Sequence, residues 1–98
     1  SHLVEVLSSN LNKYNNMNFS YEANMAGDNL ELNVHATTDN LSKSSIYTKI
    51  GYLRTLNQRI RAVYPDIDIY GQIIYPGDIE PLTFSISDNK VRSRDLLD

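Results

Sequence analysis

The stretch FSYEANMAGDNLELNVHA, residues 19–36, decides the fold. Apolar and polar residues alternate on both sides of a central Gly27-Asp28 pair. Such alternation is typical of half-buried strands, and a turn at Gly27-Asp28 therefore predicts a β-hairpin. In this register apolar residues face one another on one side: Met25 with Leu30, Ala23 with Leu32 and Tyr21 with Val34. A slip of one residue would break all of these pairs together, so the pattern fixes the register.

A helix is expected on each side of this hairpin. Residues 3–14 carry apolar side chains at helical spacing: Leu3, Val6, Leu7, Leu11 and Tyr14. The polar connector TTDNLSKSS supplies candidate N-caps for a second helix at Asp39, Ser42 and Ser44. This helix is expected over residues 44–64, ending before Pro65. Its predicted buried stripe is Ile46, Ile50, Leu53, Leu56 or Asn57, Ile60 and Val63.

Gly51 lies in the middle of the second expected helix. A glycine there costs about 1 kcal/mol relative to alanine. Such a glycine often marks the close approach of another element, which is a hypothesis for the structure to test.

A second hairpin follows the second helix. Apolar residues alternate with polar ones over residues 67–75, the segment PGDIEP turns the chain, and alternation resumes over residues 82–87. The segment SDNK ends this last strand, although Val91 could extend the pairing. The order helix, strand, strand thus occurs twice.

The two halves of the chain share their pattern. Gly27-Asp28 recurs as Gly77-Asp78, and the repeat units would be residues 3–36 and 44–87. An internal αββ duplication explains this, and so does convergence, because amphipathic helices and hairpins share patterns for physical reasons. Both readings predict an α+β, two-layer fold of αββαββ order: a four-stranded antiparallel sheet with two helices on one face. We expect the two hairpins to meet along one edge, related by a pseudo-twofold axis.

Composition limits the domain count and the chemistry. With 98 residues, the chain is interpreted as a single domain. It contains no cysteine, which excludes disulfides, thiolate nucleophiles and cysteine metal ligands. Its net charge of −3 opposes non-specific binding to nucleic acid. No apolar run approaches the ~20 residues of a membrane-spanning helix.

The two ends of the sequence suggest a piece excised from a longer protein. The chain starts with Ser1-His2, which we interpret as a cloning remnant, and ends in VRSRDLLD, which resembles the start of another helix. A processed mature protein is the alternative. If the piece is excised, a signal peptide or anchor would lie outside it.

Motifs for metal binding and catalysis are incomplete. The segment DIDIYG, residues 66–71, begins like a calcium loop, but Tyr70 and Gly77 stand where oxygen ligands are needed. We therefore predict no metal and no cofactor. On the predicted sheet, a carboxylate, Glu22 or Glu31, could form an acid–base pair with His35, and Ser20 would lie opposite His35. These groups would stand on an open surface with no pocket to shift their pKa values. We therefore predict that the protein is not an enzyme.

Two candidate binding surfaces remain. The solvent-facing side of the predicted sheet carries the candidate binding residues Glu22, Asn24, Asn33, His35, Tyr70, Gln72 and Ile74. Tyr70 and Ile74 are large apolar groups on a wet face, which indicates a contact patch. A basic flank of the second helix is formed by Lys43, Arg54 and Arg61. This flank is either a solvated helix face or a docking site for an acidic partner, and nucleic acid is not favoured.

These observations predict a non-catalytic interaction or assembly module of a larger bacterial extracytoplasmic protein. It would bind a protein partner, or a second copy of itself, through the open sheet face or through a sheet edge, since no strand carries an internal proline or lysine to guard it. The alternative is a small-ligand or glycan-binding domain that uses the same polar face. An extracytoplasmic or cell-surface location is favoured over a cytoplasmic one.

Overall fold

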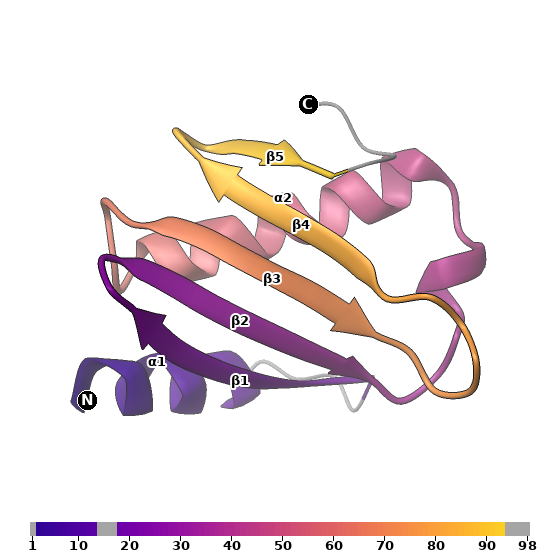
Figure 1. The fold of residues 1–98 in the computed structure, drawn as a ribbon, viewed down its shortest axis with the longest axis horizontal. Coiled ribbons are helices and arrows are strands. Elements are labelled where there is room, and N and C mark those ends of the chain that lie inside the picture. Colours follow the sequence, from indigo (N-terminus) through magenta and orange to yellow (C-terminus); the bar gives the residue numbers. More distant parts are fainter. Residues whose placement is uncertain (1, 14–17, 94–98) are drawn as a thin grey trace.

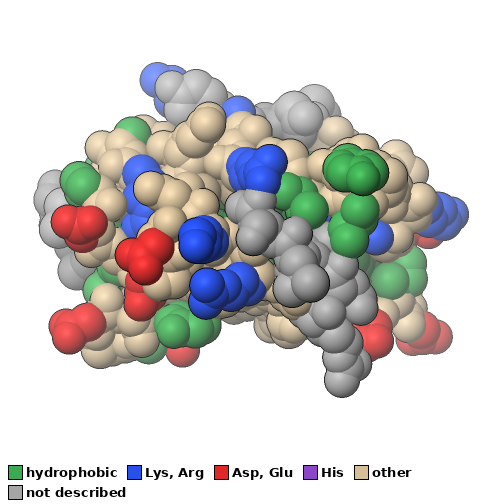
Figure 2. Space-filling model, turned by 90° about the horizontal axis from the view of Figure 1, so that it is seen from above, with side chains coloured by type: hydrophobic (Ala, Val, Ile, Leu, Met, Phe, Trp, Pro, Cys, Tyr) green, Lys and Arg blue, Asp and Glu red, His purple; other side chains and the backbone are tan. Residues whose placement is uncertain are grey.

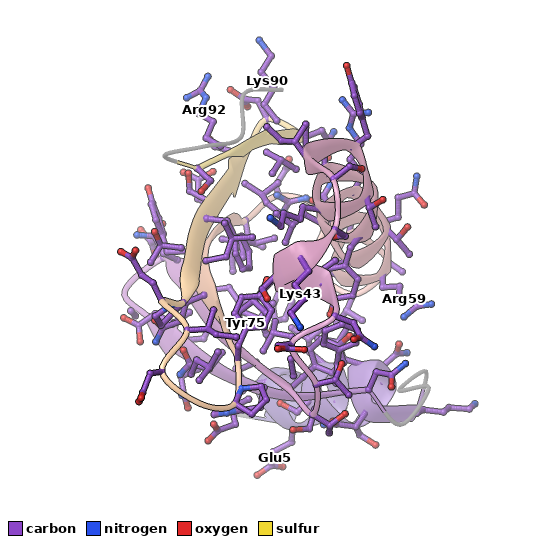
Figure 3. All side chains as sticks on the ribbon, turned by 90° about the vertical axis from the view of Figure 1, so that its right-hand side faces the viewer. Glu5, Lys43, Arg59, Tyr75, Lys90 and Arg92 are labelled. Atoms are coloured by element: carbon purple, nitrogen blue, oxygen red, sulfur yellow. The ribbon has the colours of Figure 1, made fainter. Side chains whose placement is uncertain are left out.

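The computed structural model describes residues 2–13 and 18–93. Within these residues, two α-helices, a 3₁₀ turn and five strands follow one another (Figure 1): α1 (His2–Lys13), β1 (Phe19–Ala26), β2 (Asn29–Ala36), η1 (Leu41–Lys43), α2 (Ile46–Arg61), β3 (Asp68–Ile74), β4 (Leu82–Ser87) and β5 (Lys90–Arg92). The strands form one sheet in the order β1-β2-β3-β4-β5. Both helices lie on the same side of this sheet, so the predicted two-layer α+β arrangement is confirmed (Figures 1 and 3).

The first hairpin has the predicted register. Met25 pairs with Leu30, Ala23 with Leu32 and Tyr21 with Val34, around a turn at Gly27-Asp28. Gly27 has a φ of +62°, a conformation that glycine adopts without steric cost, which explains the glycine at this point of a tight hairpin.

The sheet departs from the prediction in two ways. A fifth strand, β5, pairs antiparallel with β4 after a turn at Asp88 and Asn89, so the expectation of four strands is wrong. The two hairpins do meet along one edge, but the contacting strands β2 and β3 are parallel, so the sheet is mixed rather than antiparallel. A strand–helix–strand connection on one face of a sheet joins parallel strands, and α2 makes this connection.

The parallel pairing also excludes the expected pseudo-twofold axis. An axis normal to the sheet would make β2 and β3 antiparallel, and an axis within the sheet would place the helices on opposite faces. Neither arrangement agrees with the parallel β2–β3 pair and the single helical layer (Figure 1). The internal duplication itself stays a prediction.

The helices differ from their predictions mainly at their ends. Ser45 is the N-cap of α2, its side chain accepting a hydrogen bond from the Thr48 amide, although neighbouring residues had been favoured. In α1, Val4 is buried while Val6 is 40% exposed, so Val6 was wrongly placed in the core. Ile46, in the first turn of α2, is also exposed.

One cluster of apolar side chains fills the space between the helices and the sheet. α1 contributes Val4, Leu7 and Leu11; the rest of the cluster is Tyr21, Ala23, Leu30, Leu32, Val34, Leu53, Leu56, Ile60, Ile69, Ile73, Tyr75, Phe84, Ile86 and Val91. Asn57 is a buried polar residue, and it is satisfied: its amide donates to Asn89 Oδ1, and its carbonyl oxygen accepts from Arg61 Nε. It thereby ties α2 to the β4–β5 turn.

The close approach expected at Gly51 occurs at a different glycine. A Cβ built on Gly51 meets nothing within 4 Å, whereas one on Gly71 would collide with the Leu32 carbonyl oxygen and come within 2.7 Å of Phe84 Cζ. The Phe84 ring therefore lies over the β3 backbone, where only glycine leaves room.

Candidate functional site

The sheet face opposite the helices is the surface on which the predicted binding residues gather. None of its side chains on β1–β5 is buried, and Tyr70 is 49% exposed. All of the candidate binding residues lie on it: Glu22, Asn24, Asn33, His35, Tyr70, Gln72 and Ile74. We call this surface the open face.

The strand register arranges these residues in transverse rows. One row crosses all five strands and consists of Asn24, Glu31, Tyr70, Ser85 and Arg92. The next row contains Glu22, Asn33, Gln72 and Thr83, and the row beyond it Ser20, His35 and Ile74. Tyr70 stands on β3, the middle strand, and is therefore near the centre of the open face.

Three side-chain contacts connect neighbouring strands on the open face, and one of them is the hydrogen bond that Ser87 Oγ on β4 donates to Asp68 Oδ1 on β3 over 2.9 Å. His35 Nε2 lies 2.5 Å from Glu22 Oε1, linking β2 to β1, and Gln72 Nε2 donates to Asn33 Oδ1 over 3.2 Å, linking β3 to β2. Side chains of Glu22 and His35 are 64% and 43% exposed, so water screens their interaction. Without burial, this pair lacks the environment in which acid–base catalysts acquire their strength. The arrangement is suited to reversible polar contact.

Sequence reasoning missed the basic part of the open face. Lys90 and Arg92 are exposed on β5, and their register partners Ser87 and Ser85 show that they share this face. Arg92 and Tyr70 line the same shallow hollow. Figure 3 shows both basic side chains extending from the β5 end of the molecule, away from Glu5 of α1. The alternating segment KVR after Asp88-Asn89 was the available signal for this strand.

The predicted basic flank does not act as one surface. Lys43 lies on η1 and forms an ion pair with Asp39 at 3.2 Å. Arg61 turns toward its own chain: it donates to Asn57 Oδ1 and to the carbonyl oxygens of Tyr64 and Ile67, which fixes the connection from α2 to β3. Arg54 is exposed on α2. Seen from the β5 side, several basic side chains lie near the middle of the surface, and basic and acidic side chains lie together toward its ends (Figure 2).

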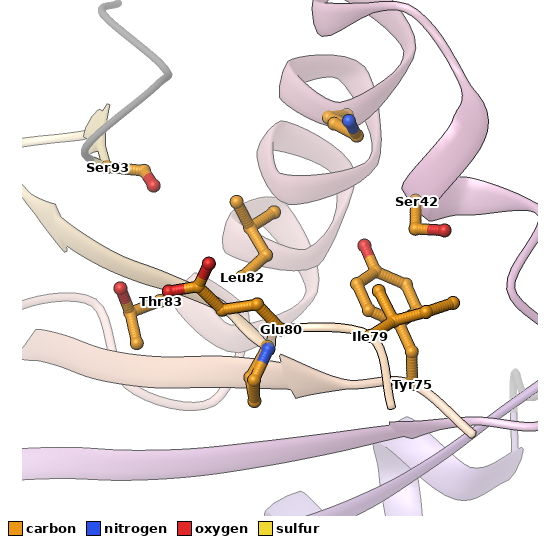
Figure 4. Close-up of a pocket in the computed structure, with 9 residues that line it drawn as sticks. Ser42, Tyr75, Ile79, Glu80, Leu82, Thr83 and Ser93 are labelled. Atoms are coloured by element: carbon orange, nitrogen blue, oxygen red, sulfur yellow. The ribbon is translucent and has the colours of Figure 1, made fainter. Parts of the chain in front are cut away.

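A hollow of about 520 Å³ separates the 3₁₀ turn and α2 from the β3–β4 connection. Figure 4 shows Glu80, Thr83 and Ser93 with side-chain oxygens turned toward the same space. Tyr75 forms part of its wall, and its buried hydroxyl has no hydrogen-bond partner among the described residues. Burial raises the pKa of Tyr75. The hollow is open to solvent.

A second aromatic group lies on the helix side of the sheet. The hydroxyls of Tyr21 and Tyr52 are 2.7 Å apart, and the Phe19 and Tyr52 rings stack with centroids 4.6 Å apart. Burial is the main cause that raises the pKa of both tyrosines, and the charge of Arg59 opposes the rise. This group joins the edge of the sheet to α2.

Carboxylates line a further hollow near the ends of β2 and β3. Asp28, Asp66, Asp68 and Asp88 contribute to its wall together with Arg61. Within residues 2–13 and 18–93, however, no group of three or more His, Cys, Asp or Glu residues is placed to hold a metal ion.

Comparison with known proteins identifies no matching family, no matching curated protein and no matching solved structure. The case for function therefore depends on the chemistry of the open face itself. Neither of the described helices is long and apolar enough to cross a lipid bilayer.

Proposed function

We propose that this chain is a non-catalytic interaction or assembly module that binds a protein partner through the open face. One observation carries the proposal: a whole face of the five-stranded sheet has no covering element among the described residues, and Tyr70 stands half-exposed near its centre. Aromatic side chains amid polar ones are typical of the centres of protein interfaces. Membership in a larger bacterial extracytoplasmic protein stays a prediction from the sequence.

The structure favours the open face over a sheet edge as the contact surface. On β1, the Asn12 side chain occupies the edge: its Nδ2 donates to the Tyr21 carbonyl over 3.2 Å and its Oδ1 accepts from the Tyr21 amide over 3.1 Å. An added strand would have to displace this side chain. The opposite edge, β5, has only three residues, and two of them are the basic Lys90 and Arg92. Short, charged edge strands discourage strand addition.

Site-specific photo-crosslinking in the source cells tests this function. A benzophenone amino acid placed at Tyr70 should give a discrete crosslinked product, which mass spectrometry then identifies. The same substitution at Gln58, an exposed residue of α2 on the other side of the molecule, serves as the matched control. Absence of any product at Tyr70, or equal products at both positions, would contradict the proposal.

A small-ligand or glycan-binding domain is the alternative. The hollow of about 370 Å³ beside Tyr70 favours it, because Thr83, Ser85 and Arg92 there offer hydroxyl and guanidinium groups next to an aromatic ring. A thermal-shift screen with sugars and short peptides separates the two functions. A ligand present at a hundred times its dissociation constant should stabilise the fold by about 2.7 kcal/mol, and the substitution Tyr70→Ala should abolish this shift.

A further inference from the structure

Opposite charges occupy opposite flanks of the open face. β1 and β2 carry Glu22 and Glu31, while β5 carries Lys90 and Arg92. Strands lie about 4.8 Å apart, so β1 and β5 are separated by roughly 19 Å. In the part of the chain that the structure describes, Glu31, Lys90 and Arg92 form no ion pair. The charges of Glu31, Lys90 and Arg92 thus remain available to an outside partner, whereas Glu22 already contacts His35.

A second copy of the same face is complementary to this pattern. A twofold axis lying between two facing sheets and running along β3 would place β5 of one copy over β1 of the other. Arg92 would then lie over Asn24 of the second copy, within side-chain reach of Glu22 and Glu31. Tyr70 would meet Tyr70 of the second copy near the axis. The contacts of Arg92 occur twice, as do all off-axis contacts of an isologous interface, whereas the Tyr70 contact near the axis occurs once.

The charges also select this axis over the other face-to-face twofold. An axis running across the strands would place Glu31 over Glu31 and Arg92 over Arg92, and like charges in direct opposition are unfavourable. The axis along β3 avoids both of these oppositions. It does bring Asp68 over Asp68 of the second copy, where each carboxylate already accepts a hydrogen bond from Ser87 Oγ of its own chain. Both axes keep the strands of the two sheets aligned, which is the common geometry when sheets pack face to face, so the charges decide between them.

We infer that the open face binds the open face of a second copy of this chain, with Arg92 of each copy against Glu22 and Glu31 of the other. This inference rests on the proposed function and names its partner. The molecule measures 34 × 27 × 20 Å, so the flat contact is limited to one small face. Strand spacing and length give an area of about 500 Å² per copy, below the ~800 Å² of a standard interface. The dimer is therefore weak, reversible and sensitive to salt.

Sedimentation from micromolar to millimolar protein tests the inference. The unmodified chain should show a monomer–dimer equilibrium that shifts toward monomer as salt rises. Either Arg92→Glu or Glu31→Arg should weaken dimerisation about tenfold or more, because each places like charges together. Lys13→Glu and Glu5→Arg make the same charge changes on exposed positions of α1, and both controls should leave the equilibrium unchanged.

A charge-swap experiment gives the decisive result. An equimolar mixture of the Arg92→Glu and Glu31→Arg chains should form a heterodimer more tightly than either variant pairs with itself, which also shows that both variants are folded. The inference would be overturned by an unmodified chain that stays monomeric at millimolar concentration. It would also be overturned by a mixture whose heterodimer is no tighter than the homodimers of the two variants. In that case a crosslink from Tyr70 to a different protein would leave the proposed function standing, whereas no crosslink would remove both.

Discussion

At the scale of single residues, the Tyr75 hydroxyl is the clearest energetic liability of the fold. It is buried without a hydrogen-bond partner among the described residues, and an unsatisfied buried hydroxyl costs about 1–3 kcal/mol. Removing it by Tyr75→Phe should therefore raise the free energy of unfolding by about 1 kcal/mol. Urea denaturation measures this change.

The matched control for that residue is Tyr52. Its hydroxyl bonds to the Tyr21 hydroxyl over 2.7 Å, so Tyr52→Phe removes the same atom but leaves a partner unsatisfied. The free energy of unfolding should fall by about 1 kcal/mol. If Tyr75→Phe is instead as destabilising as Tyr52→Phe, the Tyr75 hydroxyl has a partner in solution.

At the scale of elements, two glycines should respond to alanine with opposite signs. In β3, Gly71→Ala would drive a methyl group into the Leu32 carbonyl oxygen and the Phe84 ring, and we expect a loss of about 1–3 kcal/mol of stability. In α2, Gly51→Ala meets open space and should gain up to about 1 kcal/mol from helix propensity. Thermal unfolding of both variants measures the two changes in stability. Changes of the same sign would contradict the packing of the Leu32 carbonyl and the Phe84 ring against Gly71.

The β1 edge should depend on a single side chain of α1. Asn12→Ala removes both hydrogen bonds to the Tyr21 backbone, so the Tyr21 amide should exchange with solvent hydrogen at least about tenfold faster. The stability of the whole chain should fall by only about 1 kcal/mol, since this site is partly exposed. Ser9→Ala, at an exposed position of the same helix, should leave Tyr21 exchange unchanged. Equal exchange in both variants would show that Asn12 does not close the edge.

Elements differ in how well the sequence predicts them. The first hairpin is predictable because each strand has eight residues and a one-residue slip would expose every apolar side chain. By contrast, β5 has three residues and a single buried side chain, Val91, so its alternation is too short to separate a strand from a turn. The choice of Val6 over Val4 failed because the direction of a helix stripe depends on where the helix sits against the sheet, which spacing alone does not fix.

At the scale of the whole molecule, pairing between distant segments was the hardest feature to predict. The open face was correctly assigned because alternation alone decides which residues share a side of a strand. The charge balance of that face was not predicted, because Lys90 and Arg92 lie on it only when β5 pairs with β4. Likewise, the parallel β2–β3 contact follows from the path of α2 across the sheet rather than from the pattern of either strand.

The stability of the whole molecule should also fall at alkaline pH, and the tyrosines supply the cause. Burial raises the pKa of Tyr21, Tyr52 and Tyr75 in the folded state. The unfolded chain therefore releases these protons first, near the ordinary tyrosine pKa of about 10. The folded state then holds more protons than the unfolded state, so the free energy of unfolding declines as pH rises.

This decline should begin about one pH unit below pH 10, where the unfolded chain starts to ionise, and it should steepen above pH 10; at neutral pH both states keep these hydroxyls protonated. Each of the three tyrosines contributes a slope of up to about 1.4 kcal/mol per pH unit. Urea denaturation from pH 7 to pH 11 measures the effect, and Tyr52→Phe should make the alkaline slope shallower by one tyrosine's share. Substituting Tyr47, which is 82% exposed, gives the control, since it removes a tyrosine that is not buried. An identical slope in both variants would show that the buried hydroxyls ionise as readily as exposed ones. That result would contradict the close packing of α2 against the sheet edge.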